Sequence, residues 1–488
     1  MITQTYSATL VGVQAALVTV ETEVAQGMSA WHIVGLPDTS IQEARSRIRA
    51  AIKESGLAFP YNFRIITNLA PAETKKEGAA MDLAIALGII AREKKLTGLE
   101  KIMAVGELGL NGAIRPVRGI LAIAQLAAAQ KFESFFVPAE NAAEAVYVSG
   151  IVVYPVNNFR ELVMHLLGEK IIKPYVNSSA GNTERFYPHT FEQVAGNAFA
   201  KRALEIAVAG AHHILLSGAP GSGKTMLARA LPSIMPPLIP EESVEVTQIY
   251  SVFGHGAEKE LEFPIITPPY RAPHHTATSI ALLGGGASCK LGELTLANRG
   301  ILFLDEFSEF PRSVLEQLRE PLENGSIVLH RAGYVIELPT HCMLVAAQNP
   351  CPCGFATHPK KQCSCTAADL LRYHKKISGP LLDRFDMFCD VAPLEAKELL
   401  QEKTNETSEI IQQRIIAARR ILKNKISPLV LCSANAKKIL QAAAETLQLS
   451  GRGITKVTLV ARTIAALAER ETIDEQEIIE ALQYRRNN

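Results

Sequence analysis

A glycine-rich stretch, GAPGSGKT, has residue types and spacing suited to binding phosphate. It fits the pattern G-x-x-x-x-G-K-[ST]. The glycines allow a tight curl that turns backbone N–H groups inward, Lys224 can reach the β- and γ-phosphates, and the Thr225 hydroxyl can hold Mg²⁺. The predicted cradle comprises Gly218, Ala219, Pro220, Gly221, Ser222, Gly223, Lys224 and Thr225. This pattern predicts a nucleoside triphosphate site.

The flanking residues support this interpretation. HHILLSG before the cradle is a short apolar strand, and TMLARAL after it starts a helix whose N-terminus favours anions. A glycine-rich turn that matches by chance is the alternative. The order strand, loop, helix favours the phosphate site.

A second segment, GILFLDEF, supplies carboxylates about 80 residues after the cradle. Its apolar residues predict a buried strand that ends at Asp305 and Glu306. Asp305 would hold Mg²⁺ through water, and Glu306 would polarise the attacking water as a general base. An acidic helix cap after a core strand is the alternative. The spacing favours the core of an ATPase.

The elements that must position these residues divide the chain into predicted segments. Residues 1–168 alternate strand-like pieces with the helices TSIQEARSRIRAAIKESG and AAMDLAIALGIIAREK, and residues 169–190 are a polar linker without periodicity. Residues 191–395 contain the cradle and the carboxylates. Residues 396–488 predict a helical lid, with apolar residues at helical spacing in SEIIQQRIIAARRILK and a capping pattern at Asp474 and Glu477. The fold class is α/β and multidomain.

Composition limits the partners of the chain. The net charge is +1, so a nucleic-acid surface would have to be a local patch, and 48% hydrophobic residues are ample for several cores. The first twenty residues lack the basic start of a signal peptide, and no stretch is long and apolar enough to span a membrane. We therefore expect a cytoplasmic protein whose eight cysteines do not form disulfides.

Several motifs together resemble a known family. They are AKRALEIAVAGAHHILLSGAPGSGKT, YRAPHHTATSIALLGGG, GELTLANRGILFLDEFSEF, LVAAQNPCPCG, SGPLLDRFD and VARTIAALAE. The chain resembles AAA+ ATPases of the magnesium-chelatase-like group, most closely the YifB/ComM family, over nearly its whole length. This implies a ring-forming ATPase, a hexamer, with ATP and Mg²⁺ as cofactors and DNA as partner. Members are implicated in branch migration during recombination of incoming DNA.

The resemblance also implies roles for three residues after the carboxylates. Asn349 matches sensor 1, which orients the attacking water; a turn-forming Asn before a proline is the alternative. Arg384 matches the arginine finger, which reaches the γ-phosphate bound by the adjacent subunit. Arg452 resembles the lid's sensor 2, with Arg462 as competitor, although the aromatic residue that the family has soon after this arginine is missing here.

A salt bridge with Asp383 or Asp386 is the alternative role for Arg384.

Two segments are predicted to face the pore of the ring. By resemblance, PYRAPHHTATSIALLGGG is an insert, and ENGSIVLHRAGYVIELP, residues 323–339, predicts a β-hairpin. Cationic side chains there could grip the phosphodiester backbone without reading sequence. The DNA-binding candidates are Arg271, His274, His275, His330 and Arg331. The alternatives are an ordinary surface hairpin and, for the adjacent histidines, a metal site, although neighbours on a regular element point apart.

Four cysteines lie within CPCGFATHPKKQCSC, namely Cys351, Cys353, Cys363 and Cys365. Four thiolates suit tetrahedral zinc, and a lysine pair within the loop, at residues 360 and 361, would soften their negative charge. The C-x-C spacing is less diagnostic than C-x₂-C, and free thiols are the alternative. The other cysteines are isolated, and we expect them to be buried: Cys289, Cys342, Cys389 and Cys432.

The N-terminal block contains KKEGAAMDLAIALGI and VGELGLNGAIRPVRGILAIAQLAAAQ, which resemble the Lon-type proteolytic domain, a fold shared with ribosomal protein S5. The serine and lysine that such a site needs would fall near Ala80 and Ile123. Both groups are missing, so we predict no peptidase activity. The block would instead bind DNA or help to assemble the ring. One helix carries the cations Arg45, Arg47, Arg49 and Lys53 partly on one face, where a solvated face is the alternative to a phosphate contact.

These observations favour a DNA-directed ATPase motor. The alternative from another class is a chelatase-like motor subunit that remodels a protein partner, and the N-terminal block is the feature expected to separate the two. A protease is opposed by Ala80 and Ile123, and a nucleotide-gated scaffold is opposed by the carboxylate pair.

Overall fold

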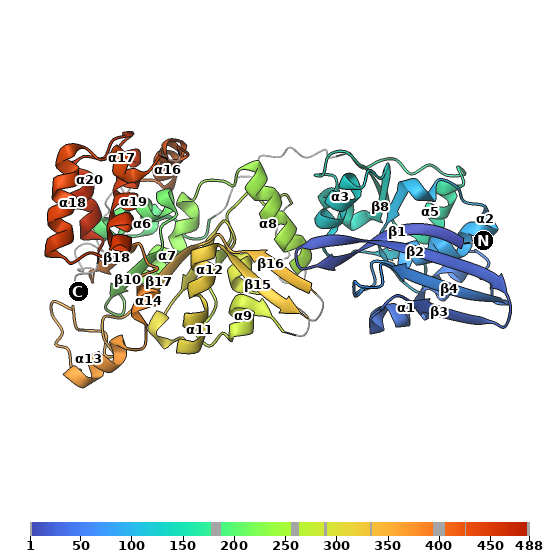
Figure 1. Cartoon of the computed structure of the whole chain (residues 1–488), viewed down its shortest axis with the longest axis horizontal. Helices are drawn as coiled ribbons and strands as arrows, with labels where there is room; N and C mark the ends of the chain where they lie inside the picture. The colour runs from blue at the N-terminus through green and yellow to red at the C-terminus, as the bar shows by residue number, and fades with distance from the viewer. Residues whose placement is uncertain are drawn as a thin grey trace. The chain divides into compact units, whose positions relative to one another are not determined.

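The computed structural model describes residues 2–176, 187–254, 263–286, 290–331, 334–393, 406–424 and 426–485. It divides into two compact units. Unit 1 contains Met1–Thr183, Ser243–Ile265 and Val328–Glu337, and unit 2 contains Glu184–Glu242, Ile266–Ile327 and Leu338–Asn488. Figure 1 shows both units, with many of their elements labelled. Two short segments from the middle of the chain therefore belong to the same unit as the N-terminal block.

Unit 1 is built on a mixed seven-stranded sheet in the order β3-β4-β2-β1-β5-β8-β9. Strands β1 and β2 are antiparallel, as are β2 and β4, while the remaining neighbours are parallel. The strands are β1 (Ile2–Val11), β2 (Gln14–Gln26), β3 (Ala30–Val34), β4 (Phe63–Ala70), β5 (Ile102–Ala104), β8 (Ser134–Pro138) and β9 (Val152–Val156), with a separate pair β6 (Glu107–Leu108) and β7 (Ile114–Arg115).

The helices of unit 1 include the two predicted from the sequence. They are α1 (Thr39–Glu54), α2 (Asp82–Lys94), α3 (Ile120–Ala129), α4 (Ala142–Ala145) and α5 (Phe159–Leu166). Asp38 caps α1 by accepting a hydrogen bond from the Ile41 backbone N–H. Helix α2 is apolar on every side and is buried almost throughout, which makes it the central core helix of this unit.

Most of helix α8 (Pro240–Phe253) also belongs to unit 1. The Gln248 amide donates to the Val13 carbonyl at 2.6 Å, and the Gly119 backbone N–H donates to the Ser251 carbonyl at 2.9 Å. These bonds tie α8 to the turn after β1 and to the start of α3.

Unit 2 is built on a five-stranded parallel sheet in the order β11-β14-β17-β10-β18. The strands are β11 (Tyr270–Arg271), β14 (Ile301–Leu304), β17 (Met343–Gln348), β10 (Ile214–Gly218) and β18 (Met387–Val391). The predicted strands before the cradle and before the carboxylates are confirmed as β10 and β14. Because the carboxyl ends of parallel strands meet at one edge, the cradle, the carboxylates and Asn349 are brought to the same edge.

Short elements complete the region around this sheet. The helices are α6 (Ala198–Gly210), α7 (Lys224–Ala230), α9 (Ser279–Leu283), α10 (Glu293–Leu296), α11 (Arg312–Gln317), α12 (Arg319–Asn324), α13 (Ala367–His374) and α14 (Gly379–Leu382). Two strand pairs stand apart from both main sheets: β12 (Gly284–Gly285) with β13 (Lys290–Leu291), and β15 (Ser326–Arg331) with β16 (Tyr334–Pro339). Most of the second pair, Val328–Glu337, belongs to unit 1. The second pair confirms the predicted hairpin.

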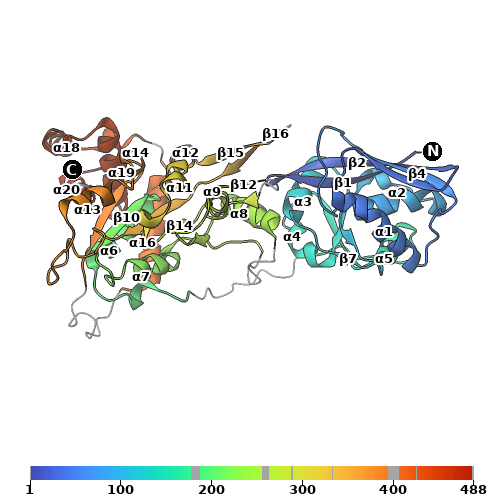
Figure 2. The same ribbon diagram turned by 90° about the horizontal axis from the view of Figure 1, so that it is seen from below.

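The C-terminal part is helical, as predicted, and consists of α16 (Ser408–Leu422), α17 (Pro428–Leu431), α18 (Ala434–Thr446), α19 (Gly451–Leu467) and α20 (Glu475–Gln483). Helix α19 packs against α16 and α20, as Figures 1 and 2 show. The predicted capping box is present, with Asp474 and Glu477 exchanging hydrogen bonds at the start of α20.

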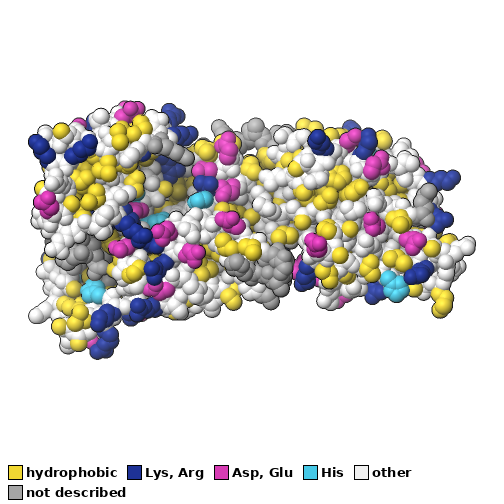
Figure 3. Space-filling model, in the orientation of Figure 1, with side chains coloured by type: hydrophobic (Ala, Val, Ile, Leu, Met, Phe, Trp, Pro, Cys, Tyr) yellow, Lys and Arg dark blue, Asp and Glu magenta, His cyan; other side chains and the backbone are white. Residues whose placement is uncertain are grey.

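The surface is mixed in charge. On the face drawn in Figure 3, Lys and Arg side chains are interspersed with Asp and Glu side chains over both units. Among the described helices, none is both long and apolar enough to cross a membrane.

Candidate functional site

The predicted cradle is the turn from β10 into α7. Its backbone needs glycine, because Gly221 and Gly223 have φ of 78° and 94°, and a Cβ on Gly218 would lie 2.4 Å from the Val391 carbonyl oxygen. Lys224 is the first residue of α7, and its Nζ donates to the carbonyls of Gly218 at 2.7 Å and Ala219 at 3.0 Å. The loop therefore curls around its own lysine.

Two neighbouring strands, β14 and β17, are each followed by a residue whose side chain contacts this turn. The Thr225 hydroxyl donates to Asp305 Oδ2 at 2.7 Å, and Lys224 Nζ donates to Asn349 Oδ1 at 3.3 Å. Asp305 directly follows β14, and Asn349 directly follows β17. Burial lowers the pKa of the Lys224 ammonium, and the nearby Asp305 carboxylate opposes that shift. A hydroxyl, a carboxylate and an ammonium thus converge, and the two oxygen groups are the ligand types that Mg²⁺ prefers.

Glu306 differs from these buried or partly buried residues because its side chain is 58% exposed. Its backbone adopts a left-handed conformation with φ of 50°, and its Oε2 lies 2.9 Å from His275 Nδ1. The His275 ring in turn meets Phe310 edge-on. The sequence indicates His275 only as a DNA or metal candidate. Its contact with Glu306 joins residues 31 positions apart and leaves no local signal in the sequence.

The adjacent histidines also differ from the expectation that neighbours point apart. The rings of His274 and His275 lie 4.1 Å apart between centroids. They belong to an irregular stretch between β11 and α9, so the alternation of a strand does not apply to them.

The arginine predicted to act as a finger follows α14. Arg384 donates to the Arg319 carbonyl at 3.4 Å and forms an ion pair with Glu323, both of which belong to α12. Arg452, in the first turn of α19, lies 3.5 Å from the other Glu323 oxygen. The two arginines therefore share one carboxylate, which the sequence analysis did not single out.

One acidic neighbour of Arg384 in sequence, Asp386, has other partners. Asp386 pairs with Lys456 at 3.0 Å and accepts from the His213 backbone N–H. The ion pair expected as the alternative role of Arg384 thus exists with a different carboxylate. Arg462, the competitor of Arg452, donates to the Ile426 carbonyl at 3.1 Å within the helical part.

The residues predicted to contact DNA differ in their surroundings. Arg271 lies in β11 and binds Glu293 through two nitrogens, at 2.6 and 3.0 Å, which reduces the positive charge it can offer to phosphate. His274 Nδ1 lies 2.9 Å from a neighbouring threonine hydroxyl. His330 and Arg331 belong to β15, but their side chains lie outside the described residues.

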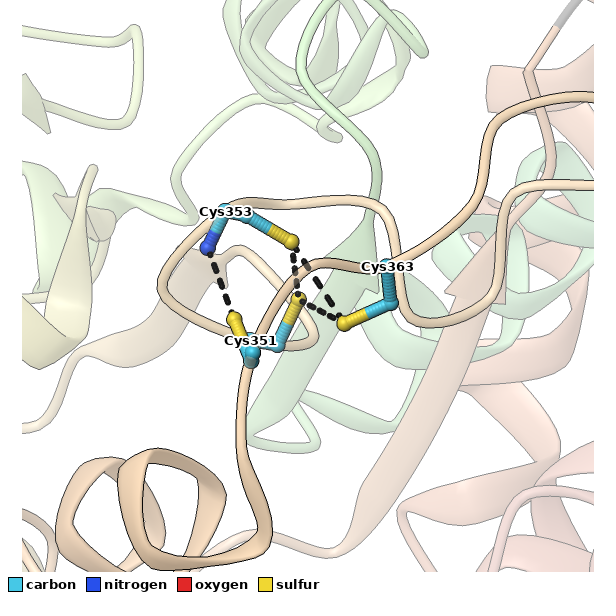
Figure 4. A group of neighbouring side chains, drawn as sticks. Cys351, Cys353 and Cys363 are labelled. Carbon is cyan, nitrogen blue, oxygen red and sulfur yellow. Dashed lines mark hydrogen bonds between the residues drawn. The ribbon is translucent and has the colours of Figure 1, made fainter.

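The four clustered cysteines come together in space, as Figure 4 shows for three of them. The sulfur of Cys351 lies 3.3 Å from that of Cys353 and 3.7 Å from that of Cys363, and the last two sulfurs are 3.5 Å apart. All four sulfurs, that of Cys365 included, lie within 4.8 Å of one another. No other such group of His, Cys, Asp or Glu ligands occurs in the part of the chain that the structure describes.

The loop also shapes the charge of its thiols. Backbone N–H groups of Phe355 and Ser364 lower the pKa of the Cys353 thiol to about 5. The sulfur separations exceed the length of about 2.05 Å of a disulfide bond. Of the cysteines expected to be isolated and buried, Cys342, Cys389 and Cys432 are buried, and Cys289 lies outside the described residues.

Of the positions where the peptidase dyad would fall, Ala80 is partly buried and Ile123 lies in the core of unit 1. The Ala80 carbonyl accepts a hydrogen bond from the Gly106 backbone N–H at 2.9 Å, and Ile123 is buried in α3.

The cations of α1 are largely engaged within unit 1. Arg47 pairs with the buried Asp82 at 3.1 Å, and burial raises the pKa of that carboxyl to about 6 against the lowering effect of Arg47. Arg45 donates to the Trp31 carbonyl at 3.1 Å, and Arg49 lies over the ring of an aromatic residue. These contacts leave less of their charge for phosphate.

Three family models match the chain. The model described as magnesium chelatase, subunit ChlI, matches residues 190–399. The model for subunit ChlI of Mg-chelatase matches residues 20–141, and that for the C-terminal part of the same subunit matches residues 405–485. Models named after one chelatase subunit thus match the cradle, the N-terminal block and the helical C-terminal part.

Relatives match over almost the full length. Competence protein ComM of Haemophilus influenzae is 37% identical over 500 residues, which cover 98% of this chain and 96% of ComM. The uncharacterized protein YifB of Escherichia coli is 37% identical over 491 residues, which cover 97% of this chain and 95% of YifB. A shorter match, 30% identical over 114 residues, covers 23% of this chain and 11% of the DNA replication licensing factor MCM2 of Arabidopsis thaliana.

Proposed function

Because the chain belongs to the YifB/ComM magnesium-chelatase-like family, we propose that it is an AAA+ ATPase that assembles into a ring, a hexamer, and moves on DNA. The observation that carries the ATPase proposal is the convergence at the cradle. Lys224 and Thr225 contact Asn349 and Asp305, which come from two other strands of the same sheet. The residues proposed to contact phosphate, to hold the metal ion and to orient water therefore lie together at one edge of the sheet, where its parallel strands end.

Each residue then has a proposed role in hydrolysis. The cradle and Lys224 bind the phosphates, and Thr225 and Asp305 would hold Mg²⁺, which neutralises charge on the β- and γ-phosphates when bound. Glu306 takes a proton from the attacking water, because its exposed carboxylate keeps access to solvent. Asn349 orients that water.

The arginines are proposed to complete the site of an adjacent copy. Arg384 and Arg452 share Glu323, so the two guanidinium groups lie close together and can face the same neighbouring site. Both would then offset the charge that develops on the transferred phosphoryl group.

We propose DNA as the partner because of what two relatives are named for. ComM is named a competence protein and MCM2 a DNA replication licensing factor. Within this class we propose branch migration at DNA junctions as the specific activity. The hairpin β15–β16 is the proposed pore element, because it stands apart from the main sheet.

A chelatase-like motor that remodels a protein partner remains the second candidate, since all three matching models carry the name of a chelatase subunit. The N-terminal block was expected to separate the two candidates. The match of this block does not separate the two candidates, because the family model over residues 20–141 is also named after the chelatase subunit. We propose a Lon-like fold without peptidase activity for this block, on the resemblance described above.

Steady-state ATP hydrolysis tests the proposal. Rates should be compared without DNA and with single-stranded, duplex and four-way junction DNA, at low and moderate salt. We expect stimulation by junction DNA that weakens as salt rises, because phosphate contacts release counterions. Glu306→Gln should abolish the stimulated rate. Hydrolysis that is indifferent to every DNA would instead favour the protein-remodelling candidate.

A further inference from the structure

The cysteine loop lies directly against the cradle. A Cβ added to Gly354 would be 2.5 Å from Cδ and 2.7 Å from Cγ of Pro220, which is the third residue of the cradle. Gly354 is buried and has a φ of 81°, and its backbone N–H donates to the Cys351 carbonyl at 2.9 Å. The turn that presents two of the cysteines therefore supports the outer side of the phosphate loop.

The same loop is continuous with the wall of the candidate site. Cys351 follows Asn349 by two residues. At the far end of the loop, Cys365 precedes the residue that caps α13, and Tyr373 of that helix returns to the site. The Tyr373 hydroxyl donates to the Asn349 carbonyl at 3.1 Å and lies 2.7 Å from the Ser308 hydroxyl, just after the carboxylate pair.

Zinc fits the arrangement of the sulfurs. Four ligands about 2.3 Å from a tetrahedral zinc ion are about 3.8 Å from one another. The three closest separations, from 3.3 to 3.7 Å, are slightly shorter than this. Two sulfurs also accept backbone N–H groups, Cys365 from Cys353 and Cys351 from Ala356, as metal thiolates do in their outer shell.

The charge of the loop is compatible with this assignment. Four thiolates around one Zn²⁺ leave a net negative charge, and two lysines follow within the loop at positions 360 and 361. Lys361 Nζ lies 4.9 Å from the centre of the Phe355 ring, which holds that ammonium against a residue of the same loop.

We propose that Cys351, Cys353, Cys363 and Cys365 bind one Zn²⁺ and that the loop closed by this ion positions the phosphate cradle through Gly354 and Pro220. The ion would join two chain segments, one continuous with Asn349 and the other with α13. The role of the loop rests on the proposed function of the cradle, whereas metal binding does not.

The first experiment separates metal binding from activity. Metal content is measured by mass spectrometry in the full-length protein and in the double variant Cys363→Ser with Cys365→Ser, with Cys432→Ser as the matched control. We expect one zinc per chain in the wild type and the control, and none in the double variant. Another metal, a disulfide within the cluster, or zinc retained by the double variant would overturn the assignment.

The second experiment tests the contact with the cradle without using hydrolysis. Amide hydrogen exchange of residues 215–231 is compared in zinc-loaded and chelator-treated wild-type protein. We expect exchange there to quicken roughly tenfold on zinc loss, and binding of a fluorescent ATP analogue to weaken by a similar factor. Unchanged exchange in protein shown to have lost zinc would overturn the positioning role.

A glycine pair gives the matched control for the contact itself. Gly354→Ala should weaken analogue binding while zinc content stays at one per chain. Gly150→Ala introduces the same backbone strain, at a φ of 88°, where the new Cβ meets nothing within 4 Å, and it should leave binding unchanged. Equal effects of both substitutions would show that strain, and not the Pro220 contact, is responsible. None of these three experiments uses DNA, so they would test the zinc site even if DNA did not stimulate hydrolysis.

Discussion

The residue proposed to bind the phosphates, Lys224, is buried, whereas the residue proposed to activate water, Glu306, is exposed. Lys224 is 9% exposed and lies among the carbonyls of Gly218 and Ala219 and the amide of Asn349, whereas the Glu306 side chain is 58% exposed. A partly desolvated ammonium interacts more strongly with a phosphate than an exposed one does. An exposed carboxylate, in contrast, keeps its access to water. The two steps should therefore be separable by substitution.

Lys224→Ala is expected to weaken ATP binding by roughly 10- to 100-fold, because a charge-assisted contact to phosphate is lost. Glu306→Gln is expected to keep ATP binding and to lower turnover by about 10²- to 10⁴-fold, because the general base is removed. Analogue binding and steady-state hydrolysis measure the two effects, with the exposed Lys375→Ala as control. Wild-type turnover by Glu306→Gln would show that another group is the base.

His275 provides a second test at this scale. Because its Nδ1 lies 2.9 Å from Glu306, we expect His275→Ala to lower kcat roughly tenfold while KM for ATP changes little. His275→Asn can place an N–H close to the position of Nδ1 and should restore much of the rate. A kcat that rises in His275→Ala would mean that the histidine restrains the base instead of orienting it.

At the scale of elements, the parts of the site that could be predicted are local. The strand, turn and helix around the cradle and the strand before Asp305 are encoded by adjacent residues, so their patterns were sufficient. The contacts of Glu323 with Arg384 and Arg452 join residues 61 and 129 positions apart. Such contacts depend on how α12, α14 and α19 pack, which no local pattern specifies.

The helical part offers a local prediction of this kind. Asp474→Ala removes half of the capping box of α20 and should cost about 1 kcal/mol of local stability. Amide hydrogen exchange of residues 475–483 measures this locally, which suits a chain with two units better than a single melting temperature does. The exposed Glu471→Ala is the control, and equal protection in both variants would contradict the role of the cap.

At the scale of the whole molecule, a single copy accounts for one half of the proposed site. Within one chain, the cradle contacts Asp305 and Asn349, whereas Arg384 and Arg452 contact Glu323. A ring with head-to-tail interfaces can supply the missing arginines from the next copy. If so, the activity belongs to pairs of neighbouring copies and not to the single chain.

Mixtures of inactive variants test this division. Arg384→Ala and Lys224→Ala should each abolish turnover alone. In a random equal mixture, about a quarter of the interfaces combine an intact cradle with an intact Arg384 from the neighbour, whatever the number of copies in the ring. We therefore expect up to roughly a quarter of the wild-type hydrolysis rate to return. Mass measurement of the mixed assemblies shows that the variants have co-assembled.

A control mixture shows whether recovery of hydrolysis requires variants from opposite sides of the proposed interface. Lys224 and Glu306 both belong to the same side of the proposed interface, so no chain in a mixture of Lys224→Ala with Glu306→Gln carries both groups. That mixture should stay inactive, whereas a mixture of Arg452→Ala with Lys224→Ala should behave like the Arg384 mixture, because the two arginines share Glu323. Rescue in the control mixture would mean that Lys224 and Glu306 act from different chains. Silence of the arginine mixtures in assemblies shown to be mixed would mean that each chain completes its own site.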